Sequence, residues 1–299
     1  MEYSDCAPIR SPLRSGIRTL RLYTLWPLLF AACLSITATA MAKGHTVLGF
    51  NLSYFGLGIA LFLLERRWPF ERAWLSNDGQ MLADFAHTAL TKGAVQIWVV
   101  VSLVFGLGSG ITAGTYWPAS WPMPLQVTLA LVIVEAGLYA AHRLAHEWPL
   151  MWPFHAVHHS VRRLWFWNTG RFHFVDTLIK IVFSMPLLLL IGAPSEVVNW
   201  VSAITAYIGM LTHCNLDLRC GILNYVFNTP ELHRWHHSRL SEEGNRNYGE
   251  NLVLWDLLLG TWSLPAGRPP LDIGINTPMA DSFRGQLLQP FRDLAKRQT

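Results

Sequence analysis

The chain has 299 residues, of which 52% are hydrophobic and only 14% are charged, and its mean hydropathy is +0.27. This composition is too apolar for an ordinary soluble domain and indicates a membrane protein. The net charge of +4 is modest and the arginines gather near the ends of apolar segments, which argues against nucleic-acid binding. The four cysteines show no C-x-x-C spacing, which argues against a disulfide framework.

Two apolar segments follow an arginine-containing start. The first, from Leu22 to about Ala42, is long enough to cross a bilayer, so we expect an uncleaved span, although its small final residues are also typical of a signal-peptidase site. The second, from Thr46 to Leu64, stops at a charged stretch. Basic residues before the first segment and after the second predict that both of these ends lie in the cytoplasm.

The middle of the chain continues this pattern. Residues 65–92 are mixed in polarity and are expected to form a cytoplasmic connection, in which the lone His87 is interpreted as structural. A third span is expected from about Val95 to Ile111, followed by an interfacial loop rich in tryptophan and proline. A fourth span, from about Leu125 to Ala141, ends directly before His142 and delivers that histidine to the cytoplasmic side.

Eight of the twelve histidines fall in three short boxes. The first box has i, i+4 spacing and the other two have i, i+3, i+4 spacing, so one or two helical turns point the imidazoles of each box the same way. The boxes are His142 and His146; His155, His158 and His159; and His233, His236 and His237.

Such a concentration of imidazoles predicts shared metal ligation. Neutral imidazole suits zinc, copper, iron and nickel, and one tetrahedral ion needs only four ligands, so eight histidines predict two ions. Only Glu147 and Glu231 flank the boxes, unlike the glutamate-rich di-iron bundles. The H-E-x-x-H motif of metalloproteases is also absent.

An apolar hairpin separates the second and third boxes. Before it, the aromatic run 165–167 is interpreted as an interfacial anchor, with a lipid-facing lid as the alternative. Segments 177–191 and 197–211 flank a Gly-Ala-Pro turn and return the chain to the same side, where His213 emerges beside the boxes. The residues after His213 contain no apolar run long enough to span a membrane and are expected to form a cytoplasmic cap.

These boxes, in this order and topology, resemble the fatty acid hydroxylase and sterol desaturase superfamily. The tail 247–261, with its N-Y-G, W-D and G-T elements, is similar to that of bacterial members. The likeness covers about residues 50–265. We therefore divide the chain into residues 1–45, an N-terminal extension and first span; 46–265, the catalytic domain; and 266–299, a C-terminal cytoplasmic tail.

The resemblance implies an all-α integral membrane protein, a transmembrane helix bundle with a cytoplasmic histidine-rich helical cap. It also implies a di-iron centre that uses O2 to hydroxylate or desaturate a lipid C–H bond. Members use further histidines between the second and third boxes, for which His213 and His173 are the candidates, although Phe174 stands where the family's R-F-H-P element has proline. The implied metal ligands are His142, His146, His155, His158, His159, His173, His213, His233, His236 and His237.

The chemistry of an alkyl C–H bond supports an oxygenase, because such a bond offers no proton to a base and requires redox chemistry. No flavin, haem or iron–sulfur motif is present, so we expect a separate electron donor, a ferredoxin or a cytochrome b5-like protein. Asp217, Asn247 and Asp256 are candidates for orienting the imidazoles. The expected location is the bacterial inner membrane, with the active site on the cytoplasmic side.

Two alternatives belong to other classes: a histidine-rich zinc or heavy-metal transporter, and a zinc-dependent lipid enzyme. A transporter needs ionisable residues along its path, yet near the middles of the expected spans the sequence has only Glu135 and Lys180. Hydroxylation is favoured weakly over desaturation. The sequence specifies neither the lipid nor the oligomeric state.

Overall fold

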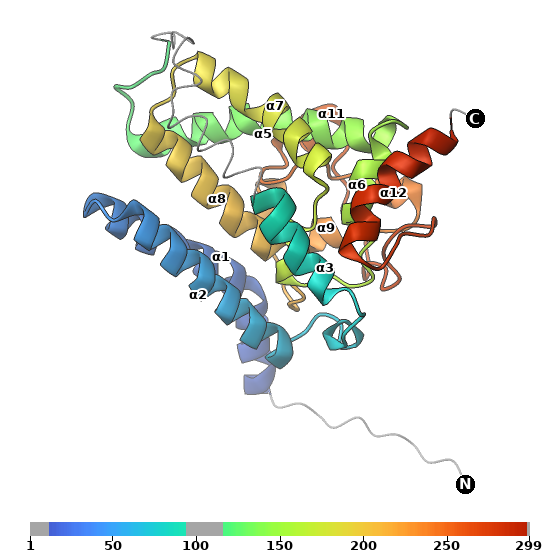
Figure 1. The fold of residues 1–299 in the computed structure, drawn as a ribbon. Helices are drawn as coiled ribbons and strands as arrows, with labels where there is room; N and C mark the ends of the chain where they lie inside the picture. The colour runs from blue at the N-terminus through green and yellow to red at the C-terminus, as the bar shows by residue number, and fades with distance from the viewer. Residues whose placement is uncertain (1–11, 94–115, 298–299) are drawn as a thin grey trace.

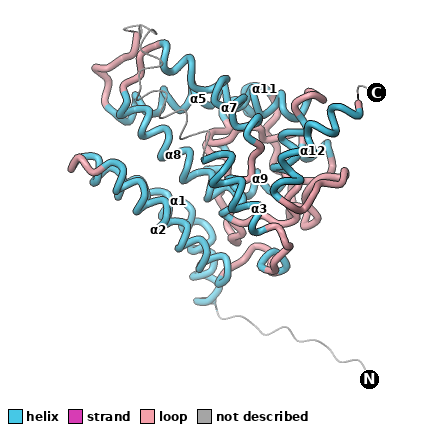
Figure 2. Tube along the Cα trace, viewed as in Figure 1, coloured by secondary structure: helices cyan, strands magenta, loops and turns pink. Residues whose placement is uncertain are grey.

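The computed structural model describes residues 12–93 and 116–297. Within these ranges the chain is helical, with no strand and only isolated bridges (Figure 2). Three described helices are long and apolar enough to cross a membrane: α1 (Pro12–Ala42), α2 (Thr46–Arg67) and α5 (Met123–Glu147). The expected third span, 95–111, lies outside the described residues.

Helices α1 and α2 form an antiparallel pair that lies beside α8 (Ser195–His213) (Figure 1). Gly49 permits the close approach of this pair, because a Cβ there would lie 2.1 Å from the Cβ of Ala40. The hydroxyls of Thr37 and Tyr207 lie 2.7 Å apart and join α1 to α8. Such hydrogen bonds between apolar helices hold them in register.

Helix α5 packs most closely against α7 (Phe174–Leu190). Gly137 faces α7 so tightly that a Cβ there would lie 2.1 Å from the carbonyl oxygen of Phe183. Helices α7 and α8 form the expected apolar hairpin, and α8 begins at Ser195, two residues before the expected apolar segment.

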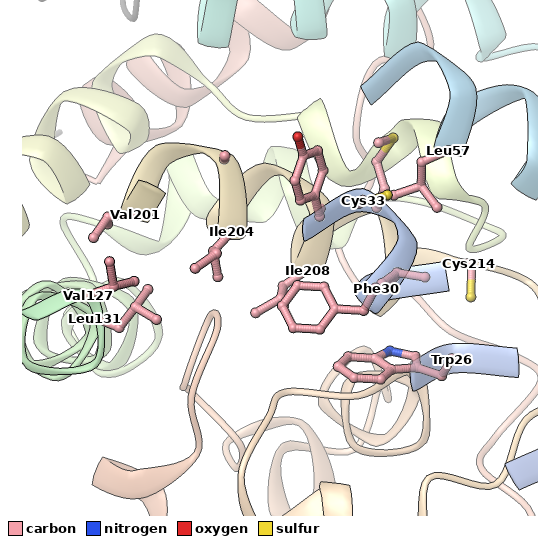
Figure 3. Packing of buried hydrophobic residues seen from close by; sticks show 14 of the residues in the cluster. Trp26, Phe30, Cys33, Leu57, Val127, Leu131, Val201, Ile204, Ile208 and Cys214 are labelled. Carbon is pink, nitrogen blue, oxygen red and sulfur yellow. The ribbon is translucent and has the colours of Figure 1, made fainter. Parts of the chain in front are cut away.

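One hydrophobic core joins these helices. It contains Trp26 and Phe30 of α1, Leu57 of α2, Val127 of α5 and Ile208 of α8, all of which are buried (Figure 3). Burial of a large apolar side chain stabilises a fold by about 1.5–3 kcal/mol relative to exposure to water. The core thereby fixes the ends of α5 and α8, which carry histidines.

Short helices gather around those ends (Figure 1). They are η1 (Ala73–Leu75), α3 (Met81–Ala86), the π-helix η2 (His87–Gly93), α6 (Trp152–His159), η3 (Phe166–Gly170), η4 (Gly221–Tyr225), α9 (Pro230–His236), α10 (Ser241–Gly244), α11 (Leu254–Leu259) and α12 (Phe283–Lys296). His87 is buried, with its ring nitrogens 3.1 Å from the Phe172 carbonyl oxygen and 3.0 Å from Gln286 Oε1, which suits a structural role.

The aromatic run 165–167 differs from the anchor that the sequence suggests. Trp165 and Phe166 are only 7% and 4% exposed. Trp165 Nε1 donates to a carboxylate oxygen of Asp84, and Phe166 lies against Gly58 of α2. Trp165 and Phe166 therefore pack inside the protein against α3 and α2, whereas Trp167 is half-buried.

Candidate metal centre

The histidine boxes lie where α5, α6 and α9 meet. The first box forms the end of α5, the second the C-terminal part of α6, and the third the end of α9 with its C-cap. Prolines in the first turn start both α6 and α9, where a missing N–H costs no hydrogen bond. His213 is the last residue of α8, so the hairpin delivers it here, as predicted.

Nine of the ten predicted ligands form two adjacent groups. Within each group, one ligand atom of every histidine lies within 4.8 Å of the others. The rings of His159 and His237 stack with centroids 4.4 Å apart and join the groups. The five-histidine group is His142, His146, His155, His159 and His236, and the four-histidine group is His158, His213, His233 and His237.

Six of the nine imidazoles place Nδ1 against an oxygen atom. Backbone carbonyls accept from three: Tyr248 from His142 and Arg246 from His236, both at 2.7 Å, and Arg171 from His158 at 3.3 Å. Side chains accept from three: Asn245 from His146 and Asn168 from His213, both at 3.0 Å, and Asp176 from His155 at 3.2 Å. Because these oxygens only accept, Nδ1 carries the proton and Nε2 keeps its lone pair.

The lone pairs of this arrangement fit a metal ion. Nε2 of His142 lies 3.0 Å from Nε2 of His236, although both rings donate Nδ1–H to carbonyl oxygens. Two neutral imidazoles so placed repel each other unless a cation lies beside them. Nε2 of His155 is also buried without a hydrogen-bond partner in the described chain. Imidazole nitrogen is a common transition-metal ligand, so two groups fit two ions.

Burial keeps these imidazoles neutral, which is the form that binds metal. Desolvation, followed by repulsion from neighbouring imidazoles, holds the pKa of His158, His159 and His233 well below the ordinary histidine value. Burial lowers the pKa of His236 to about 3.

A buried carboxylate fixes the loop that supplies two of the carbonyl acceptors. Asp256 is fully buried and accepts from the backbone N–H groups of Tyr248 at 2.8 Å and Gly249 at 2.7 Å. It also accepts from the Thr261 hydroxyl at 2.6 Å. Asp256 therefore positions the Tyr248 carbonyl, which in turn orients His142.

The two ionisable residues of the apolar segments hold the same loop. Glu135 accepts from the backbone N–H of Asn251 at 3.1 Å and from its side-chain amide at 2.9 Å. Lys180 Nζ lies 2.5 Å from a carboxylate oxygen of Glu250 and 3.6 Å from one of Asp176. These contacts attach the loop to α5 and α7.

The residues that orient the imidazoles differ from the predicted set. Asp217 pairs with Arg18 at 3.3 Å and with Arg21 at 3.8 Å. Asn247 forms hydrogen bonds with backbone groups such as the Ser263 carbonyl. Asp256 orients an imidazole only indirectly, through the loop that contains Tyr248. Sequence reasoning missed Asp176, whose signal was an acid at the start of an apolar helix. Asn168 and Asn245 carry no comparable signal.

His173 lies outside both groups. It caps α7 by accepting from the Val175 N–H at 3.2 Å through Nδ1, so its Nε2–H donates to the Leu287 carbonyl, also at 3.2 Å. Both ring nitrogens thus have protein partners. The ligand role of His173 stays a prediction, and the structure gives this residue the role of a helix cap.

A pocket of about 420 Å³ opens onto the five-histidine group. His146, His159 and His236 form part of its wall, together with Trp152. None of the four-histidine group lines this pocket. The two groups therefore differ in their access to small molecules.

Comparison with known proteins places this geometry in context. The family model described as fatty acid hydroxylase matches residues 127–261. The chain is 48% identical over 274 residues to ornithine lipid hydroxylase OlsE of Rhizobium tropici, which covers 89% of this chain and 83% of that protein. It is 32% identical to the alkylglycerol monooxygenases of Danio rerio and Xenopus tropicalis, over 44% and 43% of this chain but only 29% and 28% of those proteins. No solved structure matches the chain.

Proposed function

The chain belongs to the fatty acid hydroxylase family and is a lipid hydroxylase, and we propose that it is a di-iron enzyme that uses O2 to hydroxylate a C–H bond of an ornithine lipid. The substrate class rests on the printed name of the relative from Rhizobium tropici and on the extent of that match. Desaturation has no such support.

The two histidine groups would hold the two irons. The five-histidine group would hold one ion and the four-histidine group the other, each through the ring nitrogens that face the centre. Bound iron supplies the activation of dioxygen that no side chain can provide. The protein holds the imidazoles in place through the acceptors of their Nδ1–H groups.

The observation that carries this proposal is that the Nε2 lone pairs of His142 and His236 face each other. Both rings commit Nδ1–H to carbonyl oxygens, and both Nε2 atoms face each other at 3.0 Å in a buried site. A cation beside both nitrogen atoms would remove the repulsion between their lone pairs. Nine imidazoles without a carboxylate in either group favour a transition metal over magnesium or calcium.

The centre lies at the cytoplasmic surface of the inner membrane, an orientation supported by the basic residues in the first part of α1 and in the last turn of α2. A separate ferredoxin or cytochrome b5-like protein supplies electrons. The lipid hydroxylases among the relatives favour this function over a metal transporter or a zinc-dependent lipid enzyme.

The test is oxygen incorporation into lipid. The chain is expressed in a bacterium that makes ornithine lipid, cells grow under isotopically labelled dioxygen, and extracted lipids are analysed by mass spectrometry. We expect labelled hydroxylated ornithine lipid with the wild-type chain and with the matched control His45→Ala, which removes an exposed histidine. His236→Ala should give none. Unlabelled product, or labelled product with His236→Ala, would refute the proposal.

A further inference from the structure

A second pocket is rich in arginine and shares no lining residue with the pocket at the five-histidine group. Its volume is about 850 Å³, and it is bordered by Arg18 of α1, Arg72, Arg219 and Arg268. These arginines come from four separate parts of the chain. The pocket lies at the end of α1 and α2 that the flanking basic residues assign to the cytoplasm. We call it the arginine pocket.

Carboxylates at the base of the arginine pocket hold its guanidinium groups outward. Asp217 lies 3.3 Å from Arg18, and Glu71 lies 3.0 Å from Arg268. The acidic side chains are 27% and 15% exposed, whereas the two arginines are 54% and 53% exposed. Solvent, or a docked partner, therefore meets positive charge first.

The floor of the arginine pocket adjoins the four-histidine group. The ring of Phe70 contacts two guanidinium groups: that of Arg268, which lines the pocket, lies 4.7 Å from the ring centre, and that of Arg234 lies 3.9 Å from it. Arg234 is 1% exposed and directly follows His233 in the sequence. A short stack of side chains thus connects the pocket to the residue next to a metal-binding candidate.

A second connection reaches the same group through the backbone. Arg234 donates to the carbonyl oxygens of Cys214 at 2.9 Å and Leu216 at 2.7 Å, in the segment that follows His213. That segment also pairs with the pocket floor, because the N–H of Phe70 donates to the Asn215 carbonyl at 3.0 Å. Both connections end at residues that directly follow histidines of the four-histidine group, Arg234 after His233 and Cys214 after His213.

We propose that the arginine pocket is the docking site of an acidic one-electron carrier protein, and that electrons enter the centre through the four-histidine group. This inference rests on the proposed function. Each hydroxylation consumes one O2, two electrons and two protons; one oxygen enters the C–H bond and the other leaves as water. Two reduced carriers are therefore oxidised in turn at this site.

The observations favour a protein over a lipid headgroup. A single headgroup needs one or two arginines, whereas four are spread around this rim. Electron-transfer partners typically bind through small interfaces, and complementary charge raises their association rates by about 10–1,000-fold. A lipid-binding site would gain nothing from a connection to His233. An electron-transfer site requires such a connection, because the rate of electron transfer falls steeply with distance.

The experiment compares two sources of electrons for the full-length chain in detergent with ornithine lipid. One is an acidic plant-type ferredoxin with its reductase and NADPH; the other is dithionite with methyl viologen. The variant is Arg72→Glu combined with Arg268→Glu, and the charge-matched control is Arg284→Glu combined with Arg292→Glu, two exposed arginines of α12 outside the pocket. Iron content is measured for each protein.

We expect the double variant to raise the KM for ferredoxin about tenfold or more at low salt and to flatten its salt dependence. Turnover with dithionite and iron content should match those of the control. Any one of four results would overturn the proposal. In the double variant these are an unchanged KM for ferredoxin, a change in the KM for lipid alone, or equal losses of turnover with both electron sources. In the wild type it is turnover with dithionite but not with ferredoxin. Absence of turnover with dithionite in the wild type would instead count against the proposed function itself.

Discussion

Replacement of Asp256 tests whether a residue outside the histidine groups positions the imidazoles that would bind the metal. The carboxylate receives three hydrogen bonds, from Tyr248 N, Gly249 N and the Thr261 hydroxyl, at 2.8, 2.7 and 2.6 Å. A buried donor left without its partner costs about 1–3 kcal/mol. Asp256→Ala leaves three such donors, so we expect a loss of roughly 3–9 kcal/mol, a large part of the 5–15 kcal/mol that is typical of a folded protein.

Asp256→Asn is the more informative variant because it preserves the shape of the side chain. One oxygen continues to accept, whereas the new amide N–H₂ faces a donor. We expect a smaller loss of stability, about 1–3 kcal/mol, together with iron binding weakened about 10–100-fold, because the Tyr248 carbonyl that orients His142 shifts.

The assay measures thermal unfolding and iron retention against a chelator in detergent. The control is Asp272→Asn, whose side chain is 82% exposed and pairs only with Arg239 at 3.2 Å. That change should cost less than about 0.5 kcal/mol and leave iron retention unaltered. If Asp256→Asn behaves like this control, the loop does not position the imidazole and our reasoning is wrong.

Three further substitutions test other parts of the centre. Asp176→Asn removes the carboxylate that accepts from His155 at 3.2 Å and should weaken iron binding about 10–100-fold in a chelator competition, whereas unchanged affinity would exclude an orienting role. His173→Ala should leave the iron content unchanged but lower stability by about 1 kcal/mol in chemical unfolding, because it removes a helix cap; loss of iron would instead restore His173 as a ligand. Gly137→Ala places a Cβ 2.1 Å from the carbonyl oxygen of Phe183 and should destabilise the protein by about 1–3 kcal/mol, so an unaltered melting temperature would contradict the tight crossing of α5 and α7.

Helix bounds show what hydropathy can and cannot predict. The predicted apolar segment begins at Leu22, but α1 begins at Pro12, because arginine is a good helix former and hydropathy marks only the apolar part. The prediction for α5 stops at Ala141, whereas the helix continues to Glu147 and includes the first box. The apolar pattern thus locates helices better than it locates their ends.

Histidine spacing predicted the candidate site well, since imidazoles at i, i+3 and i+4 must share a helix face. His213 was also found, because the expected hairpin had to return it to the boxes. The carbonyl acceptors of Arg246 and Tyr248 could not be found, since every residue has a carbonyl group and only tertiary structure selects one. Asn168 was missed for a related reason: its partner His213 lies 45 residues away.

Iron content tests the central claim most directly. The chain is purified in detergent from cells grown with the Mössbauer-active isotope of iron, alongside His236→Ala and the control His45→Ala, and analysed for metals and by Mössbauer spectroscopy. We expect about two coupled irons per chain in the wild type and the control, and a loss of that coupled pair in His236→Ala. One zinc per chain, or iron that does not depend on His236, would contradict it.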